Sequence, residues 1–260
     1  MKSRLDWRHA FTFMRGQPHW RQALLVGGLL MLLVPPVGWY VAMGYRRAVA
    51  AAARADITPL LPPIGHNFGS LLASGIATTA VILAYTALPI AIFWLASTPW
   101  HRSAAEIASF LVTVVASIVA FPPLAIPFLP VAHLAASPEQ PPQPVFIGTA
   151  LVLMAVAVFI LPAAFLSISV TGRVRAAFAA PTAVRFIVRN PGLYLEAWCI
   201  SLAATGIAVL SLPLLPWGLF WSYLAILSAF NQALAASAAT DLSGGIRRSR
   251  LVAGPSRRHG

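Results

Sequence analysis

The sequence predicts an all-α, polytopic integral membrane protein with about six hydrophobic segments, two of them broken by Pro-Pro. Hydrophobic residues make up 59% of the 260-residue chain and charged residues only 9%, whereas an ordinary soluble domain is about 25% charged. The mean hydropathy is +0.79, and several uncharged runs exceed the roughly 18 residues that indicate a transmembrane helix. Because a soluble globule must still solvate its surface, burial in a soluble core does not explain this composition. The alternating segments of about ten residues that build a membrane β-barrel are absent from the sequence.

A basic segment, residues 1–21, precedes the first apolar run. If this segment is helical, Trp7, Phe11 and Met14 fall on one side with arginines beside them. That pattern is typical of a helix that lies in the membrane interface; a frayed tail is the alternative. A signal peptide is not expected, because the charged region is long and no short apolar core with a small-residue cleavage site follows it.

The first apolar run covers 22–45 and is long enough to span a membrane once. Pro35 and Pro36 lie in its middle, where each removes a backbone donor and clashes with the preceding turn. Non-helical backbone at membrane depth persists only where protein or water covers it. We therefore expect either one kinked span or a re-entrant hairpin of two half-helices, with the prolines at the hinge.

Five further hydrophobic segments follow within a single transmembrane domain, residues 22–240. They cover approximately 68–95, 104–132, 145–170, 192–212 and 217–238. The segment 104–132 begins after a Ser-x-x-Glu capping box and then meets Pro122 and Pro123, which bend or unwind its second half. The last two segments come from one long uncharged stretch, which prolines and a glycine divide because it is too long for a single span.

The connections between these segments carry turn and interface signals. A Pro- and Gly-rich turn covers 56–69, and a stiff connector resembling polyproline II covers 137–144. Residues 173–189 place four arginines among Val, Phe and Ile, which predicts a second basic interfacial segment. An Asn-Pro-Gly sequence then suits the start of the next helix. The Arg-rich segment 241–260 is expected to be a disordered tail.

The positions of arginine and lysine predict the orientation, because cytoplasmic loops carry an excess of both. With six spans and the N-terminus inside, fifteen of the 18 basic residues lie on the cytoplasmic side, and Arg46, Arg47 and Arg54 lie outside. If both Pro-broken segments re-enter the membrane, those three also come inside. Either topology predicts a multi-pass protein of the inner (cytoplasmic) membrane with both termini in the cytoplasm.

Three blocks of sequence are spaced along most of the chain, from about residue 11 to residue 236. The first comprises Trp20, Leu24-Leu25-Val26-Gly27-Gly28-Leu29-Leu30, Pro35, Gly38 and Gly44-Tyr45-Arg46-Arg47, and the second comprises Pro59, Leu61-Pro62 and Phe68-Gly69. The third comprises Ala177-Phe178, Arg185, Ile187, Arg189-Asn190-Pro191-Gly192, Tyr194-Leu195, Ala197-Trp198 and Ser201-Leu202. Together they resemble a family of bacterial and archaeal integral membrane proteins known only as a domain of unknown function. The resemblance implies the membrane fold and no established activity.

The chain departs from that family's pattern at two places. Relatives tend to carry Trp and acidic residues after the Leu-Pro of the second block, where this chain has Pro63-Ile64-Gly65-His66-Asn67. They also tend to carry an acidic residue where Leu193 stands. If those carboxylates bind a ligand in relatives, the resemblance implies that this chain has lost the site.

Polar residues inside the spans are functional candidates, because ionisable groups are costly in a membrane. Glu196 lies in the second turn of the fifth span, one heptad after Arg189, so the two are expected to share a face. Glu196 is either a proton or cation site or an interfacial carboxylate paired with arginine near a helix N-terminus. Asn231 and Gln232 in the sixth span either line a polar path or form hydrogen bonds between helices.

Two other groups of residues are candidates for lipid binding and for packing. Arginines at the ends of the apolar segments are expected to contact anionic lipid headgroups; these are Arg46, Arg47, Arg173, Arg175, Arg185 and Arg189. A small-residue stripe recurs every four residues in the sixth span and favours close helix packing; it consists of Ala225, Ala229, Ala233 and Ser237. We expect this stripe to pack within the chain first and to support self-association second.

No enzyme activity is expected from this sequence. It contains no G-x-G-x-x-G, P-loop, G-x-S-x-G or H-E-x-x-H motif, and the six carboxylates are scattered. The single Cys199 provides neither a disulfide nor a zinc pattern, and His66, His101 and His133 lack metal-like spacing. We therefore expect no cofactor and no metal. Because the arginines lie at segment ends, anionic lipid is favoured over nucleic acid as their partner.

Two functions remain for such a chain. The first is a non-catalytic membrane component that packs against partner proteins or lipids, which the scarcity of intramembrane charge and the small-residue stripe favour. The second is a small transporter or channel with its site at Pro35-Pro36 and Pro122-Pro123, since interrupted helices mark binding sites in transporters. The sequence places few polar groups near those breaks, so the first function is preferred.

Overall fold

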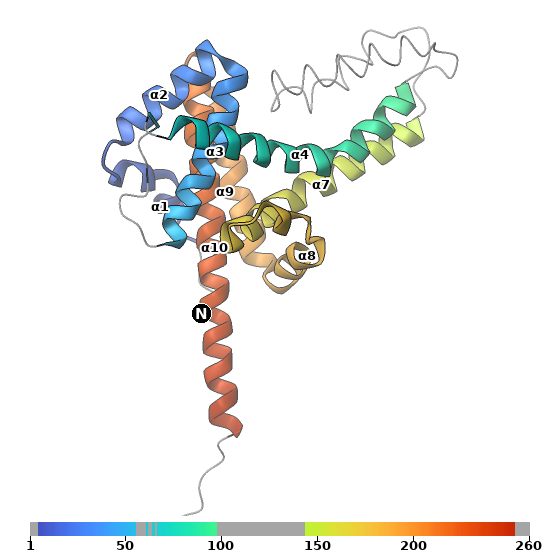
Figure 1. Ribbon diagram of the computed structural model, residues 1–260. Helices are drawn as coiled ribbons and strands as arrows, with labels where there is room; N and C mark the ends of the chain where they lie inside the picture. Colours follow the sequence, from blue (N-terminus) through green and yellow to red (C-terminus); the bar gives the residue numbers. More distant parts are fainter. Residues whose placement is uncertain (1–4, 56–60, 62–63, 66, 98–143, 253–260) are drawn as a thin grey trace, which may run out of the picture.

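The computed structural model describes residues 5–55, 61, 64–65, 67–97 and 144–252, and all the regular elements in these ranges are helical (Figure 1). The first part contains α1 (Trp7–Thr12), the 3-10 helix η1 (Phe13–Gly16), α2 (Trp20–Leu33) and α3 (Pro35–Arg54). The remainder contains α4 (Phe68–Ser97), α7 (Pro144–Thr171), η2 (Val174–Phe178), α8 (Ala180–Arg189), α9 (Pro191–Leu210), η3 (Leu212–Leu214) and α10 (Leu215–Val252). The predicted all-α class is therefore confirmed.

Four helices of the described chain are long and apolar enough to cross a membrane. They are Phe68–Phe93, Pro144–Thr171, Pro191–Leu210 and Leu215–Ala238. These coincide closely with four of the six hydrophobic segments that hydropathy predicts, and Trp20–Leu33 is a shorter apolar helix. The predicted segment 104–132, with Pro122 and Pro123, lies outside the described residues.

The first apolar run is divided between α2 and α3. Val34 between them has a non-helical backbone, and Pro35 and Pro36 occupy the first positions of α3, where their missing N–H groups break no intrahelical hydrogen bond. The two helices fold back on each other so closely that a Cβ at Gly38 would collide with the backbone of Leu30. The run therefore folds as a hairpin of two helices and not as one kinked helix, and its predicted re-entry into the membrane stays a prediction.

Two helix pairs meet at the centre of the molecule. The helices α9 and α10 are neighbours joined through η3, while α4 and α7 form a second pair that runs across them and extends to one side (Figure 1). Helix α3 packs along α4 and also contacts α7 and α10. It therefore occupies the junction between the two pairs.

Two glycines permit the close packing of α3 against α4. A Cβ at Gly44 would collide with the carbonyl oxygen of Leu71, and a Cβ at Gly75 would collide with the carbonyl oxygen of Tyr40. Small residues let membrane helices bring their backbones together in this way. The contact depends on backbone atoms, which cannot move aside as a flexible side chain can.

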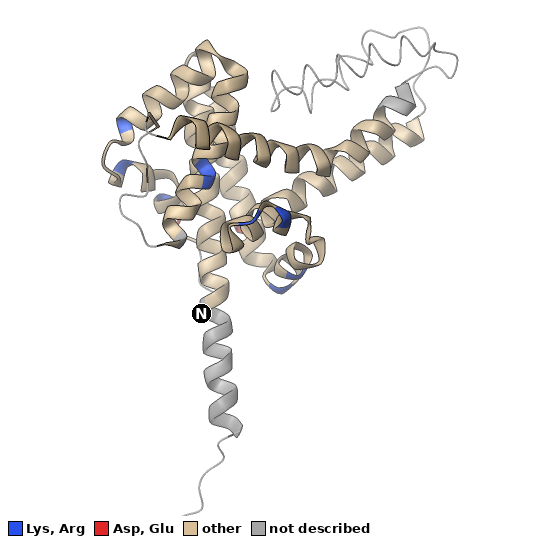
Figure 2. Ribbon diagram, in the orientation of Figure 1, with Lys and Arg blue, Asp and Glu red and all other residues tan. Residues whose placement is uncertain are grey.

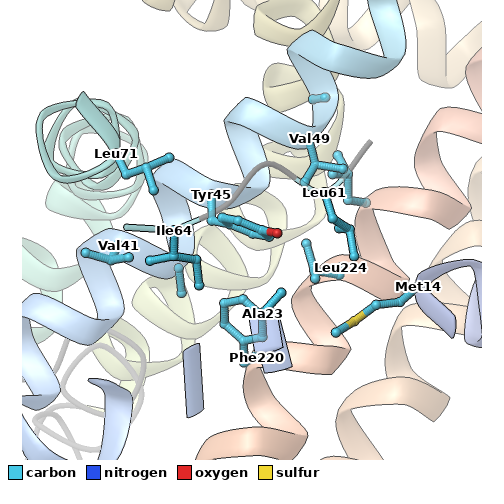
Figure 3. Packing of buried hydrophobic residues seen from close by; sticks show 13 residues of the cluster. Met14, Ala23, Val41, Tyr45, Val49, Leu61, Ile64, Leu71, Phe220 and Leu224 are labelled. Atoms are coloured by element: carbon cyan, nitrogen blue, oxygen red, sulfur yellow. The ribbon is translucent and has the colours of Figure 1, made fainter. Parts of the chain in front are cut away.

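The buried apolar residues form two main cores that share α10. The first surrounds Tyr45 of α3, with Leu61, Ile64 and Phe220 among its members (Figure 3). The second surrounds Tyr194 of α9 and includes residues from α1, α7, α8 and α10. Helix α10 thus connects the α2–α3 hairpin to the rest of the fold.

The N-terminal segment packs onto this framework. The Asp6 side chain caps α1 by accepting a hydrogen bond from the His9 backbone N–H at 2.9 Å. Ala10 and Met14 are buried, whereas Trp7 is 42% exposed. The buried face therefore differs from the predicted face, which contained Trp7, because α1 ends at Thr12 and the tighter η1 changes the helical register.

At the other end of the chain, α10 continues as helix through Val252. It enters the segment 241–260 that the sequence predicts to be a disordered tail. No proline interrupts the chain between Pro216 and Pro255, so the backbone has no forced helix end there. Residues 253–260 lie outside the described chain.

Candidate functional site

Glu196 is half-buried on α9 and lies beside the N-terminal segment. Its Oε1 accepts a hydrogen bond from the Trp7 indole N–H at 3.3 Å. The expectation that Glu196 shares a helical face with Arg189 is wrong, because Asn190 has a non-helical backbone and separates α8 from α9. Sequence spacing could not reveal the Trp7 partner, which is 189 residues away along the chain.

Gln232 on α10 also binds the N-terminal segment. Its Oε1 accepts a hydrogen bond from the Asp6 backbone N–H at 2.9 Å, and its Nε2 lies 3.3 Å from the Asp6 carbonyl oxygen. Asn231 is its half-buried neighbour. Gln232 thus uses both ends of its amide to hold one residue of the chain, which corresponds to the hydrogen-bonding alternative for this side chain.

The small-residue stripe is covered within the chain. Ala225, Ala229 and Ala233 are at most 1% exposed, and Ser237 is 7% exposed. Ala229 and Ala233 belong to the core around Tyr194, where they face α9. This face of α10 is therefore already occupied by the protein's own helices.

A cavity of about 270 Å³ lies between the α2–α3 hairpin and the turn before α4, and neither Pro35 nor Pro36 lines it. Its wall includes Leu30 of α2, Tyr45 of α3 and residues of the turn before α4, such as Ile64. The Tyr45 hydroxyl is buried and has no hydrogen-bond partner among the described residues. The cavity is largely apolar with a few polar groups, which is the usual character of a small-molecule pocket.

Arg46 lies at the junction of α3, α4, α7 and α10. Its guanidinium carbon is 5.3 Å from the centre of the Phe165 ring, and it lines a cavity of about 30 Å³ together with Thr78 and Ser169. Tyr223 of α10 is close enough to interact with it electrostatically. Figure 2 shows basic residues on α3 within an otherwise uncharged part of the ribbon. Arg46 is half-buried, and no described carboxylate pairs with it.

The other candidate arginines have different surroundings. Arg47 donates a hydrogen bond from its Nη2 to the Gly172 carbonyl at 3.1 Å, just beyond the end of α7. A cation at a helix C-terminus is favourable because the last carbonyls point outward there. The four remaining arginines are all exposed, on or beside η2 and α8: Arg173, Arg175, Arg185 and Arg189. Their predicted contact with lipid headgroups stays a prediction.

The sequence pattern predicts Arg46 at the end of an apolar segment and does not predict its burial among four helices. One sequence signal could have predicted this burial. No helix-ending residue follows Arg47, and residues 48–53 continue α3 beyond it. The long α3 carries Arg46 into the junction, where tertiary packing brings Phe165 of α7 against it. Among the described residues no group of three His, Cys, Asp or Glu side chains is placed to hold a metal ion.

Residues 27–217 match the model of a family described as Protein of unknown function (DUF4013). No curated protein and no solved structure matches the chain. The matched region runs from Gly27 in α2 to Trp217 at the start of α10, so it contains Arg46 while Tyr223 lies beyond it. The resemblance inferred from the three sequence blocks is therefore confirmed. The chain is a multi-pass membrane protein that belongs to this family of unknown function, DUF4013.

Proposed function

We propose that the protein is a non-catalytic component of the inner membrane that packs against lipids or a partner membrane protein. The observation that carries this proposal is how the chain uses its polar groups. Glu196 and Gln232 bind the N-terminal segment, and the small-residue stripe is buried inside the chain. These residues act in holding the fold, which leaves apolar surface for contact with the surroundings.

The outward surface of the spans supports the same function. Leu151 and Val152 on α7 and Leu202 on α9 are each more than half exposed. Side chains of this kind suit acyl chains or the apolar helix of a partner, because lipid tails are as apolar as leucine. We propose anionic lipids as the partners of the exposed arginines. We propose neither binding of a nucleic acid nor catalysis.

The packing of the N-terminal segment supports cytoplasmic locations for both termini. Asp6 binds Gln232, which lies near the end of the apolar part of α10, Leu215–Ala238. The described start of the chain and the end of this span are therefore on the same side. The arginines of η2 and α8 precede α9, whose first turns pack beside the same part of α10. This side therefore collects basic residues, as the positive-inside rule expects for the cytoplasm.

A small transporter is the second candidate function. The cavity of about 270 Å³ favours it, because both halves of the helical hairpin that Pro35 and Pro36 interrupt contribute to its wall, and interrupted helices mark binding sites in transporters. Its wall contains the unpartnered Tyr45 hydroxyl and the polar side chains of His19 and Gln22. Most of the cavity wall is apolar, so we rank this function below the first.

Purification of the tagged protein in mild detergent, followed by mass spectrometry of the intact assembly, tests the proposal. We expect a stoichiometric membrane-protein partner or tightly held phospholipid. A monomer with neither, combined with solute flux into vesicles that contain the purified protein, would support the transporter instead. Alkaline phosphatase fused after Val252 tests the orientation, because the enzyme is active only outside the cytoplasm and should be inactive in this fusion.

A further inference from the structure

We propose that the cavity of about 270 Å³ between the α2–α3 hairpin and the turn before α4 binds one acyl chain, with its carboxylate or ester carbonyl at the start of α2. A free fatty acid and a membrane phospholipid both carry such a chain. The inference goes beyond the proposed function, because it names a ligand that a structural component and a transporter can each hold.

The wall of the cavity changes from polar to apolar along α2. Gln22, Val26 and Leu30 line it at intervals of four residues, so they lie along one face of the helix. At 1.5 Å per residue, Gln22 and Leu30 are about 12 Å apart along the helix axis. The wall opposite α2 includes the apolar side chains of Leu61, Ile64 and Phe68. The cavity is therefore elongated and amphipathic, as is an acyl chain with an oxygen-bearing head.

Tyr45 lies at the polar end of the cavity. The helices of the hairpin are antiparallel, and Gly38 packs against the Leu30 backbone, so Tyr45 farther along α3 lies level with Ala23. Both residues belong to the same core (Figure 3). The Tyr45 side chain is buried, and its hydroxyl has no hydrogen-bond partner among the described residues. A buried hydroxyl without a partner is unfavourable, and an oxygen of the ligand can accept its hydrogen bond.

The start of α2 supplies further hydrogen-bond donors at the same end. The Ala23 N–H donates the first hydrogen bond of the helix to the His19 carbonyl at 3.0 Å, so the N–H groups of residues 20–22 have no acceptor within α2. The His19 side chain makes no capping hydrogen bond. A helix N-terminus favours negative charge. His19 and Gln22 line the cavity and are exposed, so a carboxylate or carbonyl can reach these donors from the surface.

The outer surface of α2 indicates how the cavity lies in the membrane. Leu25, Leu29 and Leu32 are exposed there, which suits the acyl region of a bilayer. The helix begins with Trp20 and Arg21, whose guanidinium carbon lies 5.5 Å from the centre of the Trp20 ring. Tryptophan and arginine are typical of the headgroup region. The polar end of the cavity therefore lies nearer the headgroups than its apolar end, which is the orientation of a lipid in that leaflet.

The volume of the cavity limits the length of chain that it encloses. An apolar cavity of about 150 Å³ holds one benzene molecule, so on this scale a cavity of about 270 Å³ holds about ten carbon atoms. Decanoate therefore fits inside. A phospholipid is too large to enter as a whole and would place only the upper part of one acyl chain in the cavity.

Photo-crosslinking in vesicles of phosphatidylethanolamine and phosphatidylglycerol tests the site. One sample contains a fatty acid with a diazirine in its chain, and a parallel sample contains a phosphatidylglycerol with the same group. Mass spectrometry of peptides locates the labelled residues after irradiation. We expect at least one probe to label Leu30 and Ile64, and an excess of unlabelled decanoate to prevent this labelling. Labelling of the exposed Leu25 should persist, because bulk lipid reaches it. The probe that labels the cavity identifies the source of the chain.

Val26→Trp fills the apolar part of the cavity, and Leu25→Trp is the matched control on the exposed surface of α2. Val26→Trp should lose the decanoate-sensitive labelling of Leu30 and Ile64, whereas Leu25→Trp should retain it. Gly65→Leu fills the cavity from the opposite wall, where an added Cβ meets no atom within 4 Å, and should also lose this labelling.

The polar end is tested with Gln22→Leu and Tyr45→Phe, which each remove a donor. Both variants should require more decanoate to protect Leu30 from labelling, and an unchanged requirement in both would overturn the placement of the head at the start of α2. The proposal as a whole is overturned if decanoate leaves the labelling of Leu30 and Ile64 in the wild type unchanged. That measurement needs no variant, so it stands even where a substitution prevents folding.

Discussion

Two tyrosines, Tyr45 and Tyr194, lie at the centres of the two cores, and both are fully buried with 0% exposure. Tyr194 on α9 donates a hydrogen bond to the Phe159 carbonyl of α7, and the Phe230 ring packs against it. Tyr45 on α3 has an aromatic neighbour as well, Phe220, but its hydroxyl has no partner among the described residues. The tyrosine hydroxyl thus has a hydrogen-bond acceptor in one core and has none among the described residues in the other.

This difference separates a region that holds the fold from a region that can accept a ligand. A buried polar group without a partner costs about 1–3 kcal/mol. On α3 and its neighbour α4 such groups gather, with Trp39 and Thr79 in addition to Tyr45, and Arg46 adds a charge. The core around Tyr194 has Trp198 as its corresponding group. We therefore propose that a ligand would bind in the surroundings of α3 and that the α9–α10 pair supports the fold.

The largest expected effect comes from breaking the α3–α4 contact with Gly44→Leu. The new side chain would meet the Leu71 backbone, so the helices must separate or the variant must unfold. Overpacking usually costs about 1–3 kcal/mol and more where neighbours cannot yield. We expect a loss of more than about 3 kcal/mol, measured as a lower Tm in detergent and a smaller folded fraction in size-exclusion chromatography.

Gly206→Leu is the control for that substitution. Gly206 is on α9, is exposed, and has no atom within 4 Å of an added Cβ. Its substitution should leave the Tm unchanged or slightly higher, because leucine favours helix more than glycine does. Equal losses for Gly44→Leu and Gly206→Leu would show that the close α3–α4 packing does not exist.

Removing one hydroxyl from each core tests the comparison directly. Tyr194→Phe loses the hydrogen bond to Phe159 and should cost about 1 kcal/mol. Tyr45→Phe removes a donor that lacks a described partner, so it should be neutral or stabilising by up to about 1 kcal/mol. Chemical or thermal unfolding of the two variants, measured side by side in one detergent, gives the order of their stabilities.

The reverse order would reject the assignment of roles to the two cores. If Tyr45→Phe is the more destabilising variant, the Tyr45 hydroxyl must have a stabilising partner, such as a bound water or ligand in the neighbouring cavity. Retention of full stability by Tyr194→Phe would show that its hydrogen bond contributes nothing beyond the aromatic packing of the ring.

Hydropathy alone predicted the four apolar helices because span length follows from bilayer thickness and needs no tertiary information. The Pro35-Pro36 hinge was also predictable, since proline acts on its own backbone and the preceding turn. The choice between a kinked helix and a helical hairpin was not predictable from the sequence. It depends on Gly38 fitting against Leu30, a contact that exists only after the two helices have folded together.

The chemical surroundings of the candidate residues were the least predictable part. Asp6 and Gln232 meet across 226 residues, and Arg46 of α3 packs against the Phe165 ring of α7. A sequence pattern predicts which face of a helix is apolar, but it does not predict which other helix packs against that face. The expected pairing of Glu196 with Arg189 failed for the same reason, because local spacing was used for a contact that tertiary structure decides.

The smallest expected effect is that of Glu196→Gln, which probes the polar contacts of the Tyr194 region. The glutamine keeps an acceptor oxygen for the Trp7 indole, now 3.3 Å from Glu196 Oε1, and Trp7 is exposed enough to bind water instead. The expected loss is below about 1 kcal/mol, since a charged acceptor is replaced by a neutral one in a partly exposed contact. Unfolding measurements at neutral pH check this value. A loss above about 2 kcal/mol would mean that the carboxylate has a second, charged partner, and the region around α9 would then bind ions as well as support the fold.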